Sequence, residues 1–434
     1  MKEKRKTDSV QDNINANEIT GGVTAPRGFK SSGISCGLKK SGKKDLALVY
    51  SGKTAAAAGV FTTNDVKAAP VLVSQERLSD GRASAVIINS GNANACTGEQ
   101  GHEDARRMTE LTAGELKVDD EDVLVASTGI IGEMLSFSRI EKGIPRLVAE
   151  LQDCGQRAAE AIMTTDTCPK QIALEMKLPS RGYRIKLGGM AKGSGMLQPN
   201  MATMIAVFTT DVAIKPELLS SALREVVDVS FNRISVDWDQ STNDCVFLLA
   251  NGGAAVQGDE ISEDDISTDD ISEQKIITAK DEDYEAFILL LKKAARFLAR
   301  ELAADGEGAT KLITIEVDGA LSQKQAELVA RQIANSSLVK TACFGEDPNW
   351  GRILAAAGAR NSGIEPQKVE IIINGKRLFA CGQPLVEGRE ELEGLLADDE
   401  IKINVDLNLG DSSLKFWTSD ISYEYIKINA EYHT

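Results

Sequence analysis

Short apolar runs separated by glycine-rich turns dominate the first half of the chain. Residues 46–51 (LALVYS) and 85–90 (AVIINS) are almost continuously apolar, which predicts strands buried on both faces. Residues 122–127 (DVLVAS) predict another strand, which leads into the sequence STGIIGE. In residues 101–116 and again in residues 140–163, apolar positions recur at the spacing that predicts helices.

The second half of the chain mixes the same two patterns. Residues 216–231 begin with a proline, which suits the first turn of a helix. Residues 285–308 form a long amphipathic stretch, and we expect this helix to end near Gly306. Three further apolar runs predict strands, at residues 311–317, 369–374 and 401–410. Because helices and strands are intermixed along the chain, the sequence predicts an α/β or mixed α+β fold.

Two segments show neither pattern. The first twenty residues are polar, and we expect them to form a loosely held arm. Residues 258–274 (GDEISEDDISTDDISEQ) are strongly acidic and contain the tetrapeptide DDIS twice. This composition predicts an acidic surface insertion that contributes to the formal net charge of −16.

The overall charge and hydropathy narrow the classes of partner. A net charge of −16 argues against nucleic acid or an anionic membrane as the main partner. The longest dense apolar patch, residues 286–291, is far shorter than the roughly 18 residues that a membrane span needs. The N-terminus also lacks the apolar region of a secretory signal, so we expect a cytoplasmic location.

The counts of cysteine and histidine narrow the chemistry. The seven cysteines are scattered and form no C-x-x-C pair, which indicates a reducing compartment and predicts no zinc site. Of the two histidines, His102 lies in a polar helical segment and His433 is the penultimate residue. Neither has the surroundings of a buried base, so we do not expect a Ser-His-Asp or Cys-His mechanism.

One threonine stands where a loop rich in glycine and proline turns into a strand. Residues 193–204 (GSGMLQPNMATM) continue directly into the apolar run IAVFTTD. Thr203 could be an ordinary strand residue, because β-branched side chains suit strands. It could also be a nucleophile, since a cut between Ala202 and Thr203 would supply an α-amine as its base. An α-amine has an ordinary pKa of about 7.7–8.0, so it is substantially neutral near physiological pH.

Four other polar segments are candidates for chemistry. Residues 188–196 (GGMAKGSGM) could bring backbone close to a small ligand beside the charge of Lys192, although they fit no nucleotide-binding motif. Residues 127–132 (STGIIG) could form an oxyanion pocket from backbone N–H groups, or a plain turn. Residues 164–167 (TTDT) could be a polar helix cap, and residues 235–244 (SVDWDQSTND) a functional loop or a surface turn.

Several of these segments, in this order, resemble one enzyme family, the ornithine acetyltransferases. These are the glutamate N-acetyltransferases of the cyclic arginine pathway. The sequence AKGSGMLQPNMATMIAVFTTD is similar to the cleavage segment of that family. The other matching sequences are VTAPRGFKSSGISCGLKKSGKKDLALVYS, INSGNANACTG, STGIIGE, IMTTDTCPK, EGATK, FGEDPNWGRILAAAG and the C-terminal INAEYHT. The resemblance extends over nearly the whole chain.

The resemblance implies a self-cleaving precursor that is cut between Ala202 and Thr203. The products would be an α chain, residues 1–202, and a β chain, residues 203–434, that begins with the nucleophile Thr203. Thr128 and Gly129 would stabilise the oxyanion. The substrate contacts implied are Thr164, for which Thr165 is a close competitor, Lys192, Thr203, Glu307, Asn429 and Thr434.

The resemblance also implies a fold, an assembly and a reaction. The fold would have paired β-sheets sandwiched by helices, similar to N-terminal nucleophile hydrolases but with different connectivity. The assembly would be an α2β2 heterotetramer. N2-acetyl-L-ornithine would acetylate Thr203, and L-glutamate would then accept the acetyl group in the same pocket. No cofactor or metal is implied, and we favour the bifunctional form of the family, which also uses acetyl-CoA.

Two other functions fit parts of the sequence. A β-peptidyl aminopeptidase-like hydrolase would share the self-cleaving architecture, but those enzymes use a serine nucleophile where this chain has Thr203. A non-catalytic binding protein could keep the fold without cleavage. The joint presence of Lys192, Thr128, Gly129 and Glu307 argues against that second alternative.

Overall fold

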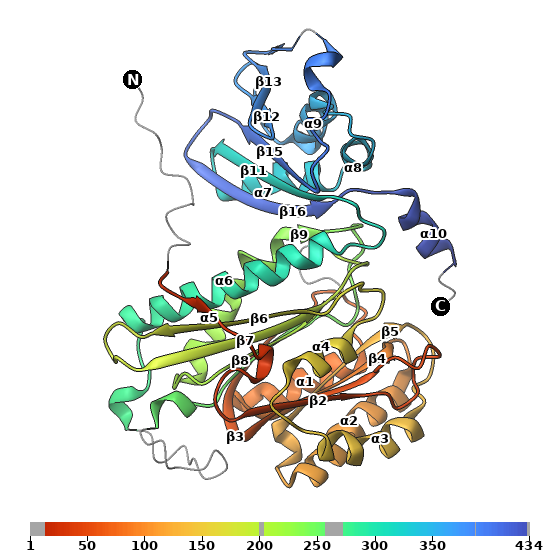
Figure 1. Cartoon of the computed structure of the whole chain (residues 1–434), viewed down its shortest axis with the longest axis vertical. Coiled ribbons are helices and arrows are strands. Elements are labelled where there is room, and N and C mark those ends of the chain that lie inside the picture. The colour runs from red at the N-terminus through yellow and green to blue at the C-terminus, as the bar shows by residue number, and fades with distance from the viewer. Residues whose placement is uncertain (1–13, 199–203, 257–271, 387, 432–434) are drawn as a thin grey trace. The chain divides into compact units, whose positions relative to one another are not determined.

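Two β-sheets organise the chain, and each lies in a unit of its own (Figure 1). The computed structural model describes residues 14–198, 204–256, 272–386 and 388–431. Unit 1 comprises Met1–Gly193, Asn200–Asn232 and Gln240–Leu298, and unit 2 comprises Ser194–Pro199, Arg233–Asp239 and Ala299–Thr434. Each unit therefore combines segments from both sides of the expected cut.

Unit 1 is built on a nine-stranded sheet with the order β1-β6-β7-β8-β10-β3-β4-β5, in which β2 also pairs with β3. The strands are β1 (Asn17–Glu18), β2 (Phe29–Ile34), β3 (Leu46–Phe61), β4 (Arg82–Asn92), β5 (Val123–Ile130), β6 (Lys170–Lys177), β7 (Arg184–Lys192), β8 (Ile205–Thr210) and β10 (Cys245–Ala250). At the centre, β8 and β10 run parallel, and all their residues are buried. Burial on both faces explains why their sequences are nearly continuously apolar.

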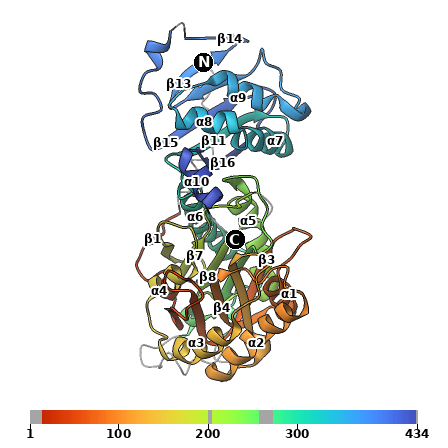
Figure 2. The same ribbon diagram turned by 90° about the vertical axis from the view of Figure 1, so that its right-hand side faces the viewer.

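Helices cover the sheet of unit 1 (Figures 1 and 2). They are α1 (Ala69–Arg77), α2 (Gly98–Leu116), α3 (Phe137–Ala149), α4 (Gly155–Ile162), α5 (Pro216–Asp228) and α6 (Glu282–Ala304), of which α6 continues into unit 2. Helix α4 packs on β2 and β3, α5 packs on β3, and α1 and α2 pack on β5. Helix α5 shows why the sequence folds this way, because Pro216 opens it and Leu219, Leu223 and Val226 form its buried face.

Unit 2 is built on a seven-stranded sheet with the order β14-β13-β12-β15-β11-β16-β9. The strands are β9 (Ile234–Ser235), β11 (Leu312–Ala320), β12 (Glu370–Ile373), β13 (Lys376–Ala380), β14 (Gln383–Pro384), β15 (Glu400–Asp406) and β16 (Ser412–Ser419). The helices are α7 (Gln323–Ala334), α8 (Ser337–Phe344), α9 (Trp350–Ala357) and α10 (Tyr423–Glu431). Helix α7 packs on β11 and β16, over a core that includes Ile313, Ile315 and Phe416.

The mixed α/β class with two sheets and helices is confirmed, and each predicted strand corresponds to an observed one. The helix predicted over 140–163 is wrong as a single element, since it is divided into α3 and α4. The backbone of Gln152, between them, instead exchanges hydrogen bonds with Ser31 of β2 at 2.9 and 3.1 Å. The extended backbone that this pairing needs interrupts the helical pattern.

The N-terminal arm, the acidic insertion and the last predicted strand have different outcomes in the structure. The loosely held arm is wrong for residues 17–18, because β1 pairs with β6 and joins Asn17 to Glu175. Residues 1–13 and 257–271 lie outside the described part of the chain, so the acidic insertion stays a prediction. The strand predicted over 401–410 ends at Asp406, since Asn408 has a φ of 51° and turns the chain.

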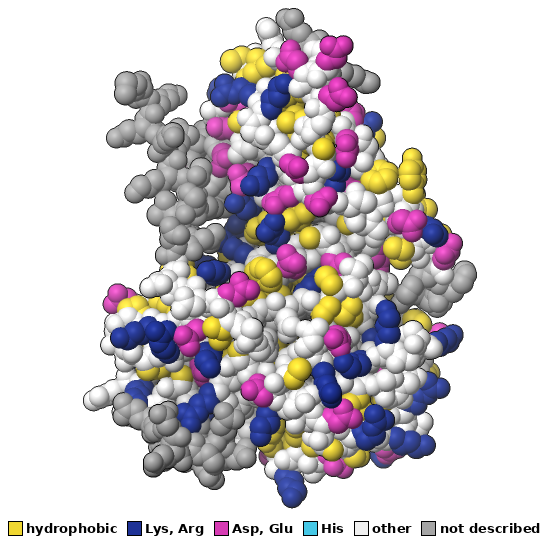
Figure 3. Space-filling view, viewed as in Figure 1, with side chains coloured by type: hydrophobic (Ala, Val, Ile, Leu, Met, Phe, Trp, Pro, Cys, Tyr) yellow, Lys and Arg dark blue, Asp and Glu magenta, His cyan; other side chains and the backbone are white. Residues whose placement is uncertain are grey.

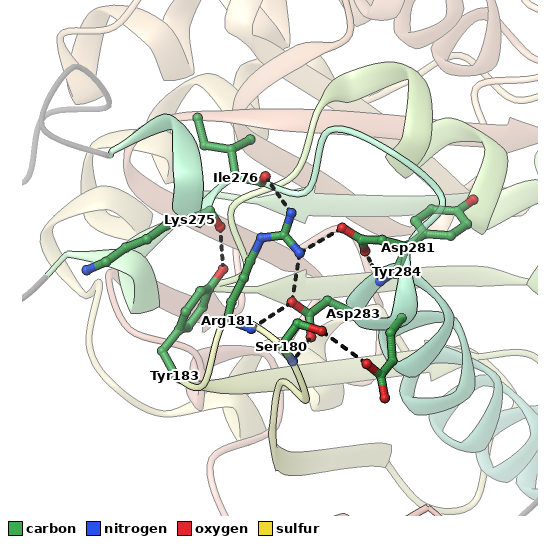
Figure 4. Close-up of polar contacts among 9 residues, drawn as sticks. Ser180, Arg181, Tyr183, Lys275, Ile276, Asp281, Asp283 and Tyr284 are labelled. Atoms are coloured by element: carbon green, nitrogen blue, oxygen red, sulfur yellow. Dashed lines mark hydrogen bonds and ion pairs between the residues drawn. The ribbon is translucent and has the colours of Figure 1, made fainter.

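Within unit 1, two ion pairs attach the start of α6 to the turn between β6 and β7 (Figure 4). The Arg181 guanidinium, in the turn between β6 and β7, bonds Asp283 at 2.7 Å and Asp281 at 2.9 Å. Asp283 is fully buried and also accepts the backbone N–H groups of Ser180 and Arg181. The start of α6 is thereby fixed to the β6–β7 turn.

The surface carries both signs of charge. On the face that Figure 3 shows, Lys and Arg side chains are interspersed with Asp and Glu side chains over the described residues. Within the described ranges, no helix is long and apolar enough to cross a membrane.

Candidate active site

The carboxyl end of β7 and the carboxyl end of β5 bring two of the predicted site residues together in unit 1. Lys192 is the last residue of β7 and Thr128 lies in β5, and both side chains are buried. The Lys192 ammonium donates a hydrogen bond to the Thr128 hydroxyl at 3.1 Å. A buried cation beside a hydroxyl is an arrangement that can bind an anionic group of a ligand.

Gly129 occupies a position that only glycine fits. Its φ is 136°, and a Cβ atom there would lie 2.4 Å from the backbone carbon of Gly91. The pairing of β4 and β5 is irregular here, because Asn92 opposes both Thr128 and Ile130. Thr128 and Gly129 therefore lie in a bulge within β5, not in a turn after it as the sequence suggested. Bulges of this kind change the direction of a strand beside a site.

The glycines before Lys192 have a packing role. Gly188 and Gly189 lie inside β7, so this part of the segment is a strand and not a ligand-cradling loop. A Cβ atom on Gly188 would lie 2.1 Å from the Gly22 carbonyl oxygen, and one on Gly189 would lie 2.8 Å from the Phe208 ring. Close packing therefore accounts for both glycines.

Asp166 connects the TTDT segment to the end of β7. Its carboxylate accepts the backbone N–H of Thr164 at 3.0 Å, the backbone N–H of Gly193 at 2.8 Å and the Lys170 ammonium at 2.8 Å. Burial alone would raise the pKa of Asp166, but Lys192, Lys170 and the Gly193 N–H lower it to about 2. Asp166 is therefore an ionised buried group that counters the charge of Lys192.

A second lysine is close to this cluster. Burial lowers the pKa of Lys39 to about 8, Asp45 acts in the opposite direction, and Lys192 lowers it further. The Lys39 ammonium donates to the carbonyl of Met163, directly before the TTDT segment, at 2.6 Å. Lys39 was not singled out from the sequence, whereas Asp166 lies inside a segment that was already a candidate.

The expected cut lies outside the described residues. Ala202 and Thr203 are not described, and neither is Thr434, so these three assignments stay predictions. The chain is described again from Met204, which is buried and directly precedes β8. The backbone N–H of Met204 donates to Asp244 at 2.9 Å.

In unit 2, the AKGSG and EGATK segments meet. The backbone N–H of Glu307 donates to the Ser194 carbonyl at 2.7 Å, and a Cβ atom on Gly195 would lie 2.5 Å from the Glu307 carboxylate. The Asn429 amide, from α10, donates to the same carboxylate at 2.9 Å. The structure thus brings together Glu307 and Asn429, which the sequence predicted as substrate contacts. A half-buried carboxylate beside an amide can bind an ammonium group.

The SVDWDQSTND segment contributes a residue that the sequence left open. The carboxylate of Asp237, in unit 2, accepts the backbone N–H groups of Met196 at 2.6 Å and Leu197 at 2.8 Å. Burial raises the pKa of Asp237 to about 6 against the lowering by these two bonds. Asp237 also raises the pKa of Tyr425 in α10, for which burial is the largest cause. Asp237 therefore fixes the chain just after the AKGSG segment.

Comparison with known proteins shows the family of the chain. Residues 30–434 match the family model described as the ArgJ family. The arginine biosynthesis bifunctional protein ArgJ of Geobacter sulfurreducens is 44% identical over 414 residues, which cover 94% of this chain and 99% of the relative. The chain belongs to the ArgJ family. The resemblance that the sequence motifs indicated is thereby confirmed.

A second ArgJ relative agrees with this assignment. The protein of the same name from Bacillus licheniformis is 43% identical over 425 residues, covering 98% of this chain and 99% of the relative. A solved structure of ornithine acetyltransferase from Mycobacterium tuberculosis, complexed with ornithine, is 43% identical, with a TM-score of 0.39. It covers 43% of this chain and 98% of that chain. Among the described residues of this chain, no group of three or more His, Cys, Asp or Glu side chains is placed to hold a metal ion.

Proposed function

We propose that the chain is a glutamate N-acetyltransferase of arginine biosynthesis, which moves the acetyl group of N2-acetyl-L-ornithine to L-glutamate. Membership of the ArgJ family supports this reaction class. The observation that carries the proposal is the buried Lys192–Thr128 hydrogen bond of 3.1 Å beside the glycine-only position Gly129. That arrangement supplies hydrogen-bonding groups for an acyl-transfer oxyanion at Thr128 and Gly129 and a cation beside them for a substrate carboxylate.

The proposal includes a self-cleavage step before the first turnover. The Thr203 hydroxyl oxygen attacks the Ala202 carbonyl carbon, and the hydroxyl proton passes to the departing Thr203 nitrogen. An ester then joins Ala202 to Thr203, and water hydrolyses it to an Ala202 carboxylate and a free hydroxyl. The products are the chains 1–202 and 203–434. The new α-amine of Thr203 is the base for the later steps.

Acetyl transfer then proceeds in two half-reactions. The Thr203 oxygen attacks the acetyl carbonyl carbon of N2-acetyl-L-ornithine while the α-amine takes the hydroxyl proton. The ornithine nitrogen leaves with that proton, and acetyl-Thr203 remains. The amine of L-glutamate attacks the acetyl-Thr203 carbonyl carbon and gives a proton to the α-amine. The Thr203 oxygen then leaves with that proton, which restores its hydroxyl and releases N-acetyl-L-glutamate. Thr128 and Gly129 stabilise the oxyanion in both steps.

The remaining assignments rest on charge and on the family. Lys192 faces a substrate carboxylate, Glu307 a substrate amine, and Thr164 and Asn429 position the substrate, with Thr434 as a further contact. We propose no cofactor and no metal, acetyl-CoA as a second acetyl donor, an α2β2 assembly and a cytoplasmic location. The substrates are small molecules, and no nucleic acid or membrane partner is proposed.

The reaction is tested by incubating purified protein with N2-acetyl-L-ornithine carrying a labelled acetyl group, with and without L-glutamate. We expect labelled N-acetyl-L-glutamate only when L-glutamate is present. Release of labelled acetate at the same rate with and without L-glutamate would indicate a hydrolase and contradict the transferase assignment. A parallel incubation with labelled acetyl-CoA and L-glutamate tests the second donor, which fails if no N-acetyl-L-glutamate forms.

Removing the Thr128 hydroxyl should lower turnover strongly. In Thr128→Val the volume is nearly kept, but the acceptor of the Lys192 hydrogen bond is lost. We expect kcat to fall about 10²–10³-fold, the usual cost of losing one oxyanion-stabilising group. Thr112→Val is the matched control, because Thr112 is equally buried and its hydroxyl donates to the Met108 carbonyl within α2. Equal kcat values in the two variants would contradict the assignment.

Neutralising Glu307 should weaken substrate binding more than it lowers turnover. Glu307→Gln keeps an oxygen for the Asn429 amide but removes the charge. Hydrogen bonds to charged groups contribute about 1.5–3 kcal/mol, so we expect KM for N2-acetyl-L-ornithine to rise about 10–100-fold. The KM and kcat of Glu307→Gln are measured separately, with Glu424→Gln, an exposed carboxylate on α10, as the control. A fall in kcat at constant KM would contradict the role of Glu307 in substrate binding.

A further inference from the structure

One buried amide is connected to both flanks of the bulge at residues 128–129, within unit 1. Asn243, from the SVDWDQSTND segment, lies two residues before β10 and is 4% exposed. Its Nδ2 atom donates to the Ser127 carbonyl at 2.8 Å and to the Ala93 carbonyl at 2.6 Å. Ala93 in turn donates its backbone N–H to the Ile130 carbonyl at 2.9 Å. The residues before and after the bulge are therefore both held by Asn243, one directly and one through Ala93.

These contacts use the whole Asn243 amide. Its nitrogen donates to the two carbonyls, and its Oδ1 atom accepts the Thr242 hydroxyl at 2.6 Å. Because carbonyl oxygens only accept, the nitrogen of the amide must face them and its oxygen must face away. The side chain thus supplies two donors without a charge, which suits a buried position.

The backbone that carries Asn243 is itself fixed. The Thr242 carbonyl accepts the Ala68 N–H at 2.9 Å, and the Asp244 carbonyl accepts the Thr62 N–H at 3.0 Å. The neighbours of Asn243 on both sides are thus bonded to the segment between β3 and α1. A side chain on a fixed backbone keeps its hydrogen bonds in one geometry, as the support of a functional group needs.

The two anchors limit the conformation of the bulge. The Ser127 carbonyl and the Thr128 N–H share one planar peptide group, so holding the carbonyl fixes the plane that enters residue 128. The Ile130 carbonyl is held on the other side through Ala93. Between the anchors lies Gly129, with a φ of 136°, and glycine has more alternative backbone conformations than any other residue. Without the anchors, the bulge can therefore adopt other conformations.

We propose that Asn243 is a positioning residue for acyl transfer: by holding both flanks of the bulge, it directs the Thr128 hydroxyl and the Gly129 N–H towards the oxyanion. This inference rests on the proposed function, in which those two groups stabilise the oxyanion. Donors that are already oriented stabilise a developing charge most effectively, because they need no reorientation during the reaction. Loss of Asn243 should therefore slow both half-reactions and leave substrate binding largely intact.

Asn243→Ala removes both donors and leaves the two carbonyls without the amide. We expect kcat for acetyl transfer to L-glutamate to fall by about 10²-fold, the cost of displacing a reacting group by about 1 Å. KM for N2-acetyl-L-ornithine should stay within about threefold of the wild-type value, because the oxyanion forms only in the transition state. A wild-type kcat, or a rise in KM that accounts for the whole loss of kcat/KM, would overturn the proposal.

Asn251→Ala is the matched control, at the other end of β10. Asn251 is 3% exposed, its Nδ2 atom donates to the Arg27 carbonyl at 3.0 Å, and its Oδ1 atom accepts the Gly253 N–H at 2.9 Å. We expect similar decreases in thermal midpoint in the two variants, while Asn251→Ala keeps the wild-type kcat. An equal fall of kcat in both variants would assign Asn243 a purely structural role.

The acetyl-enzyme provides a spectroscopic measure of the oxyanion donors. Incubation with unlabelled and isotope-labelled N2-acetyl-L-ornithine, without L-glutamate, isolates the ester carbonyl band in an infrared difference spectrum. A hydrogen bond to a carbonyl oxygen lowers its stretching frequency. We therefore expect the band at a higher frequency in Asn243→Ala than in the wild type, and at the wild-type frequency in Asn251→Ala. An unchanged band in Asn243→Ala would overturn the proposal, since a purely structural role would leave the carbonyl environment intact.

A second variant keeps the test independent of the folding of Asn243→Ala. In Asn243→Ser the side chain offers one donor where the amide offers two, so it can hold at most one of the two carbonyls. We expect a kcat between those of the wild type and Asn243→Ala, and a carbonyl band that moves in the same direction. Wild-type values of both would overturn the proposal. A wild-type protein that forms neither an acetyl-enzyme nor N-acetyl-L-glutamate would overturn the proposed function instead.

Discussion

The Thr203→Ala protein is expected to remain a single chain of 46.5 kDa and to show no acetyl transfer, while the wild type appears as two fragments. Alanine lacks the oxygen that attacks the Ala202 carbonyl, so neither the cut nor the acetyl-enzyme can form. Loss of a covalent nucleophile removes the reaction path altogether, and residual activity should be at least about 10³-fold lower. Denaturing intact-mass spectrometry and the labelled-acetyl assay measure the two effects.

Two control variants make this result specific to the Thr203 oxygen. Thr203→Ser keeps a hydroxyl, so we expect it to be cut before residue 203 and to retain part of its activity. Thr210→Ala changes a buried threonine at the other end of β8, whose hydroxyl bonds the Lys186 carbonyl, and should be cut normally. A wild-type protein that stays uncut in a freshly purified sample would remove the α-amine base and favour the binding-protein alternative.

Asp166→Asn is expected to cause the largest loss of stability among single changes at the site. The Asp166 and Lys170 side chains are 0% and 1% exposed and form an ion pair of 2.8 Å. Removing one member of a buried pair leaves the other charge uncompensated, which costs about 3–5 kcal/mol in the free energy of unfolding. Urea denaturation, followed by the shift in midpoint, measures this loss.

A surface pair and the pH dependence provide the controls. The Arg107–Glu141 pair is mostly exposed, so Glu141→Gln should change the free energy of unfolding by less than about 1 kcal/mol. The folded-state pKa of Asp166, about 2, is below its ordinary value, so its stabilisation is present above pH 4 and is lost as the pH falls towards 2. Asp166→Asn should lack this part of the acid dependence. Equal midpoint shifts in the two variants would contradict the role of the buried pair.

The sequence predicted the elements because burial imposes its own pattern. Strands such as β4 and β10 are covered on both faces, so their residues are apolar whatever the partner strand is. The break between α3 and α4 could not be predicted in this way. It depends on the pairing of Gln152 with Ser31, more than a hundred residues earlier in the chain, and local spacing carries no record of such a contact.

The candidate site shows the same division. Thr128, Gly129 and Lys192 could be predicted as site residues because each lies in a motif that resembles the family, but the contact of Lys192 with Thr128 depends on where β5 and β7 end. Asp166 and Asp244 were both inside quoted polar segments, and each had an ordinary alternative as a cap or a turn. Only the register of β8 against β10 places Asp244 beside Met204. A contact that depends on strand register cannot be predicted from a local sequence motif.

The position of β8 determines the order in which folding and cleavage must occur. This strand lies between β7 and β10 in the middle of the sheet of unit 1, and the expected cut directly precedes it. A cut there would divide the sheet between two polypeptides, and unit 2 would also contain a piece of each. Neither polypeptide alone would then contain all the residues of a hydrophobic core. The two chains would already be packed together when they form, because the single precursor must fold first and be cut afterwards.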